Sequence, residues 1–234
     1  MSQTLHLQFT RLADLDCLAL PLQADRPTIV MLHGYGANFE DLAGLVPMLD
    51  PKGQWNWIFP NGILEVPIDQ HVMGRAWFPI DMEALQRHLM GGEVRSFAHH
   101  IPAGLETAQK RIGELISALG IKAEDLVLAG FSQGAMVTCH TMMAMKENPR
   151  ALIQLSSTLV SEETCRENMP RHQDLKIFQS HGQFDPLLPI AAARELKQVF
   201  EASSSHVDYH EFAGAHEIPL PIIQKLGSFM QSVL

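Results

Sequence analysis

Residues 126–137 read Leu126-Val127-Leu128-Ala129-Gly130-Phe131-Ser132-Gln133-Gly134-Ala135-Met136-Val137, an apolar run that passes through Gly-x-Ser-x-Gly into small residues. This pattern is typical of a nucleophile elbow, a sharp strand-to-helix turn that exposes a serine. Gly130 and Gly134 lack a Cβ where the helix must pass close to the strand, and the first helical turn offers N–H groups to an oxyanion. The alternative is an ordinary turn with an idle serine. The apolar run before the motif favours Ser132 as a nucleophile.

A second glycine-rich motif, His33-Gly34-Tyr35-Gly36, directly follows the apolar and β-branched run of residues 28–32. Such a run indicates a buried parallel strand. A turn at its end can direct a backbone N–H at the nucleophile, so we expect the amides of Tyr35 and Gln133 to form an oxyanion hole. Alternatively, His33 only ends the strand, with its imidazole bonded to a neighbouring backbone group.

The candidate acid is Asp185, which follows the strand-like run of residues 176–180. Ligands and catalytic groups in open α/β sheets gather beyond the carboxyl ends of strands, where a carboxylate can orient an imidazole. An Asp-Pro pair is also an ordinary turn. Asp174 and Asp208 are poorer candidates, because the first precedes its strand and the second lies within one.

The candidate base is His216, in a small-residue loop between the strand-like run of residues 207–212 and a helical pattern. The chain holds twelve histidines, so position alone does not single this one out. The order Ser132, Asp185, His216, each after a predicted strand, is however the order of the α/β-hydrolase triad.

Together these motifs resemble the phospholipase/carboxylesterase family that includes acyl-protein thioesterases, a branch of the α/β hydrolases. The matching segments span nearly the whole chain and are residues 32–38, 76–78, 130–134, 181–189 and 214–217. The resemblance implies Ser132 as nucleophile with Asp185 and His216 as its partners. It also implies the amides of Tyr35 and Gln133 as the oxyanion hole.

Two departures from the family pattern concern the shape of the pocket and leave the reaction class untouched. Ala135 replaces a glycine that is usual after the elbow. Leu155-Ser156-Ser157 stands where Leu-Ser-Gly is usual.

Hydrophobic periodicity predicts alternating strands and helices. We expect strands at residues 5–9, 17–22, 28–32, 55–59, 151–155, 176–180 and 207–212 and at the elbow, with helices at residues 38–46, 102–119, after the elbow and near the C-terminus. This order predicts a mostly parallel sheet with an antiparallel start and helices on both faces. It is an α/β-hydrolase architecture, with residues 1–234 as one catalytic domain.

The spacing between elements predicts an open site. Only about twenty residues separate the strands at 151–155 and 176–180, where larger relatives insert a lid domain. The irregular stretch 61–95 is apolar, and Met82, Leu85 and Leu89 fall on one side of a short helix, so it is a candidate flap over an acyl chain. Plain packing under a long loop is the alternative. We expect four side chains to contact substrate: Trp77, Phe78, Met82 and Leu187.

Composition limits the partners. The net charge of −9, with both signs scattered, argues against nucleic acid or an anionic membrane surface. No run is long and apolar enough to cross a bilayer, so stable membrane insertion is not expected. His88, His99 and His100 lack a carboxylate or cysteine at ligand spacing, so we expect no metal, and no cofactor motif is present. A weak homodimer stays open.

Cysteine usage and the N-terminus favour the cytoplasm. Cys17, Cys139 and Cys165 are an odd, widely spaced set, and residues 1–6 lack a charged-then-apolar signal pattern. Cys139 falls within the helix after the elbow, on a face expected to be buried, which argues against a reactive thiol.

The sequence therefore predicts a serine hydrolase that cleaves small-molecule carboxylic esters or thioesters through an acyl-enzyme on Ser132. Two alternatives remain. A non-catalytic binding protein of the same fold is disfavoured because all three triad residues are intact, and a peptidase is disfavoured because no gating domain is visible.

Overall fold

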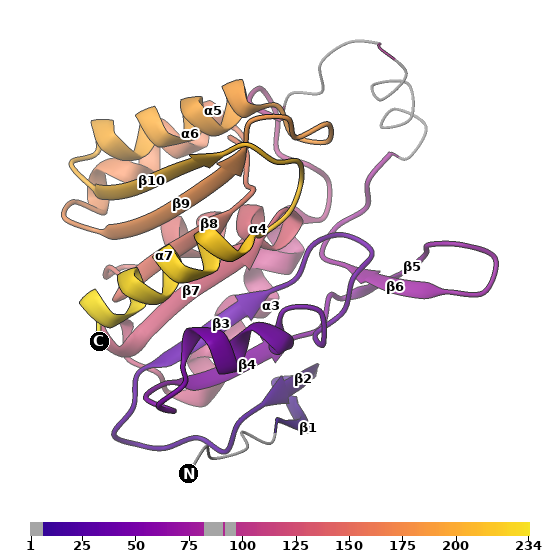
Figure 1. The fold of residues 1–234 in the computed structure, drawn as a ribbon, viewed down its shortest axis with the longest axis vertical. Coiled ribbons are helices and arrows are strands. Elements are labelled where there is room, and N and C mark those ends of the chain that lie inside the picture. The colour runs from indigo at the N-terminus through magenta and orange to yellow at the C-terminus, as the bar shows by residue number, and fades with distance from the viewer. Residues whose placement is uncertain (1–6, 82–90, 92–96) are drawn as a thin grey trace.

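The computed structural model describes residues 7–81, 91 and 97–234, and its centre is one eight-stranded sheet (Figure 1). The strands lie in the order β1 (Gln8–Leu12), β2 (Leu15–Ala19), β4 (Asn56–Pro60), β3 (Thr28–Leu32), β7 (Leu126–Phe131), β8 (Ala151–Leu155), β9 (Lys176–Gly182) and β10 (His206–Phe212). β2 is antiparallel to both β1 and β4, and all other neighbours are parallel. The predicted mostly parallel sheet with an antiparallel start is confirmed.

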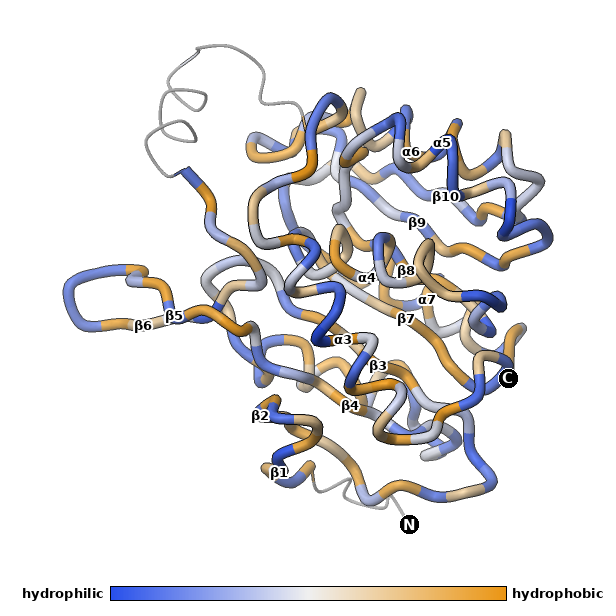
Figure 2. Tube along the Cα trace, turned by 180° about the vertical axis from the view of Figure 1, so that it is seen from behind, coloured by the Kyte–Doolittle hydropathy of each residue, from blue (hydrophilic) through white to orange (hydrophobic). Residues whose placement is uncertain are grey.

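Helices cover both faces of the sheet, as predicted (Figure 1). They are α1 (Val46–Leu49), α3 (Leu105–Leu119), α4 (Gln133–Ala144), α5 (Glu162–Asn168), α6 (Ile190–Ala202) and α7 (Leu220–Ser232). α1 and α7 pack on one face and the others on the opposite face, so each face has its own apolar cluster. All five residues of β3 and of β8 are buried, because helices cover both sides. Figure 2 shows the mainly hydrophobic character of the central strands.

The helix predicted at residues 38–46 was wrong. The chain there forms turns, a short 3-10 helix at Ala43–Leu45 and the single turn of α1. The Asn38 side chain accepts a hydrogen bond from the Glu40 amide at 2.8 Å, which fixes a turn in place of a helical start. Pro47 then lies in the first turn of α1, where no N–H is needed.

The stretch 61–95, expected to be irregular, holds a hairpin of β5 (Leu64–Pro67) and β6 (Met73–Ala76) that projects from the body (Figure 1). A Cβ at Gly74 would lie 2.0 Å from the Gly36 carbonyl oxygen, so only glycine allows this approach. The Gly36 amide donates to the Arg75 carbonyl, and the Arg75 amide donates to the Ala37 carbonyl, both at 2.8 Å. The base of the hairpin is thereby fixed to the loop after β3. The expected flap helix, with Met82, lies outside the described residues.

No large separate domain is inserted within the described ranges. The chain between β8 and β9 carries only α5 and a short 3-10 helix at Met169–Arg171. The described ranges thus hold no large lid domain between these strands, as predicted. Among the helices that the structure describes, none has the length and apolarity to cross a membrane.

Candidate active site

The candidate nucleophile occupies a strained turn between β7 and α4. Ser132 has φ +54° and ψ −120°, a backbone conformation that side-chain-bearing residues rarely adopt. A Cβ at Gly134 would lie 2.3 Å from the Leu32 carbonyl oxygen, and one at Gly130 would lie 2.4 Å from the Ala135 amide nitrogen. Both positions therefore require glycine, and the geometry is that of a nucleophile elbow.

The candidate acid and base are in direct contact. His216 Nδ1 lies 2.6 Å from Asp185 Oδ2, while Asp185 Oδ1 accepts the amides of Leu187 and Leu188 at 2.8 and 2.9 Å. Burial alone would raise the pKa of Asp185, but the hydrogen bonds to His216 and to the two amides hold it below its ordinary value. An ionised carboxylate keeps the His216 proton on Nδ1 and leaves Nε2 available as a base.

Close packing of two loops brings this pair together. A Cβ at Gly182 would lie 2.0 Å from the Ala215 carbonyl oxygen, so the loops that carry the acid and the histidine meet at a glycine. The amides of Gln183 and Phe184 donate to the Phe212 and Gly214 carbonyls at 2.9 and 3.0 Å. These contacts follow from the parallel pairing of β9 with β10.

His216 and Ser132 line the same pocket, and the His216 ring lies 4.8 Å from the Phe131 ring, centroid to centroid. The structure thus gathers the three predicted triad residues at one edge of the sheet. The rejected acids lie beside other histidines: Asp208 is 2.9 Å from His210, and Asp174 is 3.6 Å from His206.

A second histidine, which the sequence reasoning did not single out, lies beside the Asp185 carboxylate. His181 is fully buried, with Nε2 at 2.8 Å from the Leu188 carbonyl oxygen and 3.4 Å from Asp185 Oδ2. Burial lowers the pKa of His181, so the neutral ring donates its Nε2–H to Leu188. The only sequence signal for this contact is the motif His-Gly-x-x-Asp, in which His181 precedes the loop that carries Asp185.

The two expected oxyanion donors lie beside the nucleophile. Tyr35, Gln133 and Ser132 all line the pocket. A Cβ at Gly34 would lie 3.3 Å from the Ser132 Cβ, which shows how closely the loop passes the elbow. Neither the Tyr35 nor the Gln133 amide has a hydrogen-bond acceptor within the described part of the chain. Both N–H groups are therefore free for a ligand.

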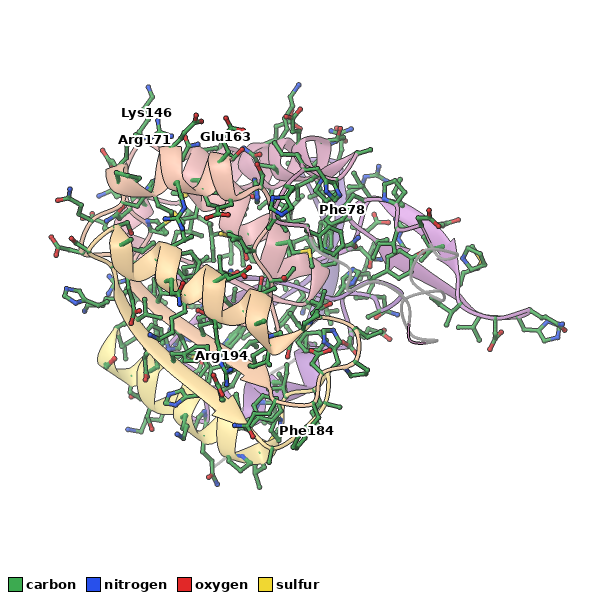
Figure 3. The ribbon with its side chains drawn as sticks, turned by 90° about the horizontal axis from the view of Figure 1, so that it is seen from above. Phe78, Lys146, Glu163, Arg171, Phe184 and Arg194 are labelled. Atoms are coloured by element: carbon green, nitrogen blue, oxygen red, sulfur yellow. The ribbon has the colours of Figure 1, made fainter. Side chains whose placement is uncertain are left out.

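Trp77 and Phe78 have a different place from the one expected. Both are fully buried, and neither lines the pocket; Figure 3 shows Phe78 within the body of the protein. The Gln133 side chain accepts the Trp77 amide at 2.8 Å and donates to the Phe78 carbonyl at 2.7 Å. Trp77 Nε1 donates to the His33 carbonyl at 2.9 Å. We therefore revise their role: they position the elbow and the loop after β3 instead of contacting an acyl chain.

The pocket beside Ser132 has a volume of about 170 Å³ and a mainly apolar wall. Leu187 belongs to this wall, as expected. The remaining apolar residues of the wall are Ile80, Phe97, Phe131, Met136 and Leu188, with Ala37. Phe184, in contrast, points outward from the loop before Leu187 and is 71% exposed (Figure 3).

His33 fixes the shape of the loop that carries Tyr35. Its Nδ1–H donates to the Gly34 carbonyl at 2.7 Å, and its Nε2 accepts the Gly62 amide at 2.9 Å, so both ring nitrogens of a neutral imidazole are used. Burial lowers the pKa of His33 to about 4. The imidazole is therefore bonded to backbone groups, and these bonds hold the loop whose Tyr35 amide is the expected oxyanion donor.

Two buried histidines should make the fold acid-sensitive. The pKa values of His33 and His140 are both lowered from 6.5 to about 4, mainly by burial. In the pH range between these values the unfolded chain binds protons that the folded chain does not, so stability is complete above about pH 6.5 and is lost toward pH 4 and below. We expect a loss of about 3 kcal/mol per histidine.

Urea unfolding at about pH 7.5 and about pH 4.5 measures this loss directly. His140→Gln should reduce the difference between the two pH values, whereas His99→Gln, at an exposed site, should leave it unchanged. Equal unfolding free energies at the two pH values in the unaltered protein would contradict the assignment.

The described ranges hold no group of three or more His, Cys, Asp or Glu side chains suited to a metal ion. His99 and His100 are exposed. The three cysteines are free and buried, which agrees with the expectation that Cys139 is not a reactive thiol.

The sheet order, the elbow and the acid–histidine pair at one sheet edge define the α/β-hydrolase class of fold. A family model described as phospholipase/carboxylesterase matches residues 17–234. The chain belongs to this family, as the sequence motifs predicted.

Relatives include the acyl-protein thioesterase 1 of Saccharomyces cerevisiae, 26% identical over 230 residues that cover 93% of this chain and 97% of the yeast protein. The acyl-protein thioesterase 1 of Kluyveromyces lactis is 26% identical over 226 residues, covering 93% of this chain and 96% of its own. Among solved structures, esterase PE8 has a TM-score of 0.76 at 24% identity, covering 94% of this chain and 99% of its own. A Mesorhizobium loti carboxylesterase has a TM-score of 0.70 at 16% identity, with 97% and 98% covered.

Proposed function

We propose that this protein hydrolyses carboxylic esters or thioesters through an acyl-enzyme on Ser132. The observation that carries the proposal is the 2.6 Å contact between Asp185 and His216, because His216 lines the pocket that holds the elbow serine. An oriented imidazole beside a serine, with free amides nearby, is what acyl transfer requires.

In the proposed reaction, His216 Nε2 takes the Ser132 proton as Oγ attacks the carbonyl carbon. The negative charge that develops on the carbonyl oxygen is stabilised by the amides of Tyr35 and Gln133. Asp185 stabilises the imidazolium, which then protonates the departing alcohol or thiol. His216 then takes a proton from a water molecule, which attacks the carbonyl carbon of the acyl-enzyme. The imidazolium returns the proton to Ser132 Oγ as the ester bond to the serine breaks, and the carboxylic acid leaves.

The relatives support both classes of leaving group. Proteins named acyl-protein thioesterase match over more than nine-tenths of this chain, and the family description names carboxylesterases and phospholipases. We infer a small-molecule acyl ester or thioester as substrate and action in the cytoplasm, since free buried thiols suit a reducing compartment. The non-catalytic alternative predicts ligand binding without release of acid.

A panel of p-nitrophenyl esters of rising chain length tests the proposal. The pocket volume of about 170 Å³ lies below the roughly 300–1,000 Å³ of typical ligand sites, so short acyl groups should fit best. We expect kcat/KM for the butyrate to exceed that for the palmitate by about tenfold or more, because forcing extra methylenes into a packed wall costs about 1–3 kcal/mol.

Met136→Ala provides the matched variant, because it shortens a side chain in the pocket wall, and so enlarges the pocket, without altering the triad. In this variant, kcat/KM for esters with longer acyl chains should rise relative to that for the butyrate. A rate that rises steadily up to the palmitate would contradict the pocket assignment, and the absence of hydrolysis for every ester and for S-butyryl-N-acetylcysteamine would contradict the function.

A further inference from the structure

One charged side chain in the pocket wall has no part in the reaction described above. Asp41 lies in the turns after the loop that carries Tyr35, and its amide donates to the Asn38 carbonyl at 3.2 Å. It lines the same pocket as Ser132 and His216. No Lys or Arg is found among the residues recorded in that lining.

The carboxylate of Asp41 has no structural task in the described part of the chain. It does not cap the 3-10 helix at Ala43–Leu45, whose N-cap is Leu42 and lacks a side-chain hydrogen bond. No hydrogen bond or ion pair to the Asp41 side chain is present among the described residues. Arg75, whose backbone fixes the neighbouring loop, directs its guanidinium to Glu65 and to the Gly62 carbonyl.

The Asp41 carboxylate lies where it can interact with a charged group of a bound substrate. Protein atoms around the carboxylate exclude part of its water, which raises the pKa of Asp41, although the residue is open to solvent. A carboxyl group that is open to solvent carries a negative charge at neutral pH. A negative charge beside an apolar wall acts in a lower effective dielectric than bulk water, so it attracts cations and repels anions that enter the pocket.

We propose that Asp41 sets the charge preference of the pocket, favouring esters that carry a cationic group, such as quaternary ammonium or amine, over those that carry a carboxylate or phosphate. The inference rests on the proposed hydrolase function. It adds a specificity residue that selects substrates by charge and takes no part in the chemical step.

The test compares two esters of equal shape, butyrylcholine and 3,3-dimethylbutyl butyrate, which differ in having a quaternary nitrogen or a quaternary carbon. The ratio of their kcat/KM values cancels any general loss of folded enzyme. We expect Asp41→Asn to lower the ratio of choline ester to neutral ester by about tenfold, which corresponds to about 1.4 kcal/mol. Added salt should lower the ratio more in the unaltered protein than in Asp41→Asn.

Two matched variants separate a local effect from a change in net charge. Glu40→Gln removes the same charge one residue away, at an exposed position outside the pocket, and should keep the ratio of the unaltered protein. Asp41→Glu retains the charge and should restore most of the preference. A butyrate ester that carries a free carboxylate on its alcohol part, 4-(butyryloxy)butanoate, should be an improved substrate for Asp41→Asn relative to the neutral ester.

The outcomes separate a failure of the Asp41 proposal from a failure of the proposed hydrolase function. If the unaltered protein hydrolyses neither butyrate ester, the hydrolase proposal fails. If it hydrolyses the neutral ester and Asp41→Asn leaves the ratio within a factor of about two, or Glu40→Gln lowers it equally, the specificity role of Asp41 is refuted.

Discussion

Ser132→Ala should lower kcat for ester hydrolysis by about a millionfold, the loss seen when the nucleophile of a serine triad is removed. The substitution deletes one oxygen and leaves the backbone of the elbow in place, because alanine keeps the same Cβ at φ +54°. The glycines at 130 and 134 and the contact of the Ser132 amide with the Leu155 carbonyl at 2.9 Å do not involve the hydroxyl. The fold should therefore be retained.

The measurement is single-substrate kinetics on p-nitrophenyl butyrate together with a thermal melt. Labelling by a fluorophosphonate probe should disappear in Ser132→Ala and persist in Ser228→Ala, which alters an exposed serine on α7. Residual turnover within about a hundredfold of the unaltered protein would exclude Ser132 as the nucleophile, since background catalysis by the remaining groups is far weaker.

Strands buried on both faces were the most predictable elements. The expected bounds 28–32 and 151–155 coincide with β3 and β8. A short run that is apolar on both sides is typical of a strand buried on both faces, so its ends are easily predicted. The antiparallel edge was less certain: β2 begins at Leu15, two residues before the expected start at 17. Edge strands carry mixed patterns, so their ends follow neighbouring turns more than hydrophobicity.

The errors arose where local polar contacts outweigh apolar spacing. Residues 38–46 have helical periodicity, yet the bond from the Asn38 side chain to the Glu40 amide directs the chain into turns. The β5–β6 hairpin has no strong alternating pattern. Its base is held where Gly74 lets β6 approach the Gly36 carbonyl, a contact between distant residues that periodicity does not report.

The candidate site divides in the same way. Residues within motifs, such as Ser132 and Asp185, could be predicted because the chemistry dictates their type and order. The roles of Trp77 and Phe78 could not, because an aromatic residue near a motif can face either a pocket or the core. Their role depends on hydrogen bonds between their backbone groups and the Gln133 side chain, and the residue types alone do not indicate such bonds.

Asp185→Asn should lower kcat by about ten thousandfold, through the proton position on His216. Asp185 Oδ1 accepts two amides, so an asparagine at 185 would keep its carbonyl oxygen there. Its NH₂ group would then face His216 Nδ1 and donate to it. The imidazole would carry its proton on Nε2, the nitrogen that must accept the Ser132 proton, and the base would be lost.

Stability measurements separate this tautomer effect from unfolding. The folded-state pKa of Asp185 lies below its ordinary value, so the carboxylate stabilises the fold above the unfolded pKa, and that contribution is lost as the pH falls through the folded pKa. Asp185→Asn should therefore melt lower than the unaltered protein at neutral pH, and the two should converge in acid. Asp208→Asn, beside His210 and outside the pocket lining, should keep full kcat. Activity of Asp185→Asn within about tenfold of the unaltered protein would mean that another group orients His216, because tautomer loss alone costs far more.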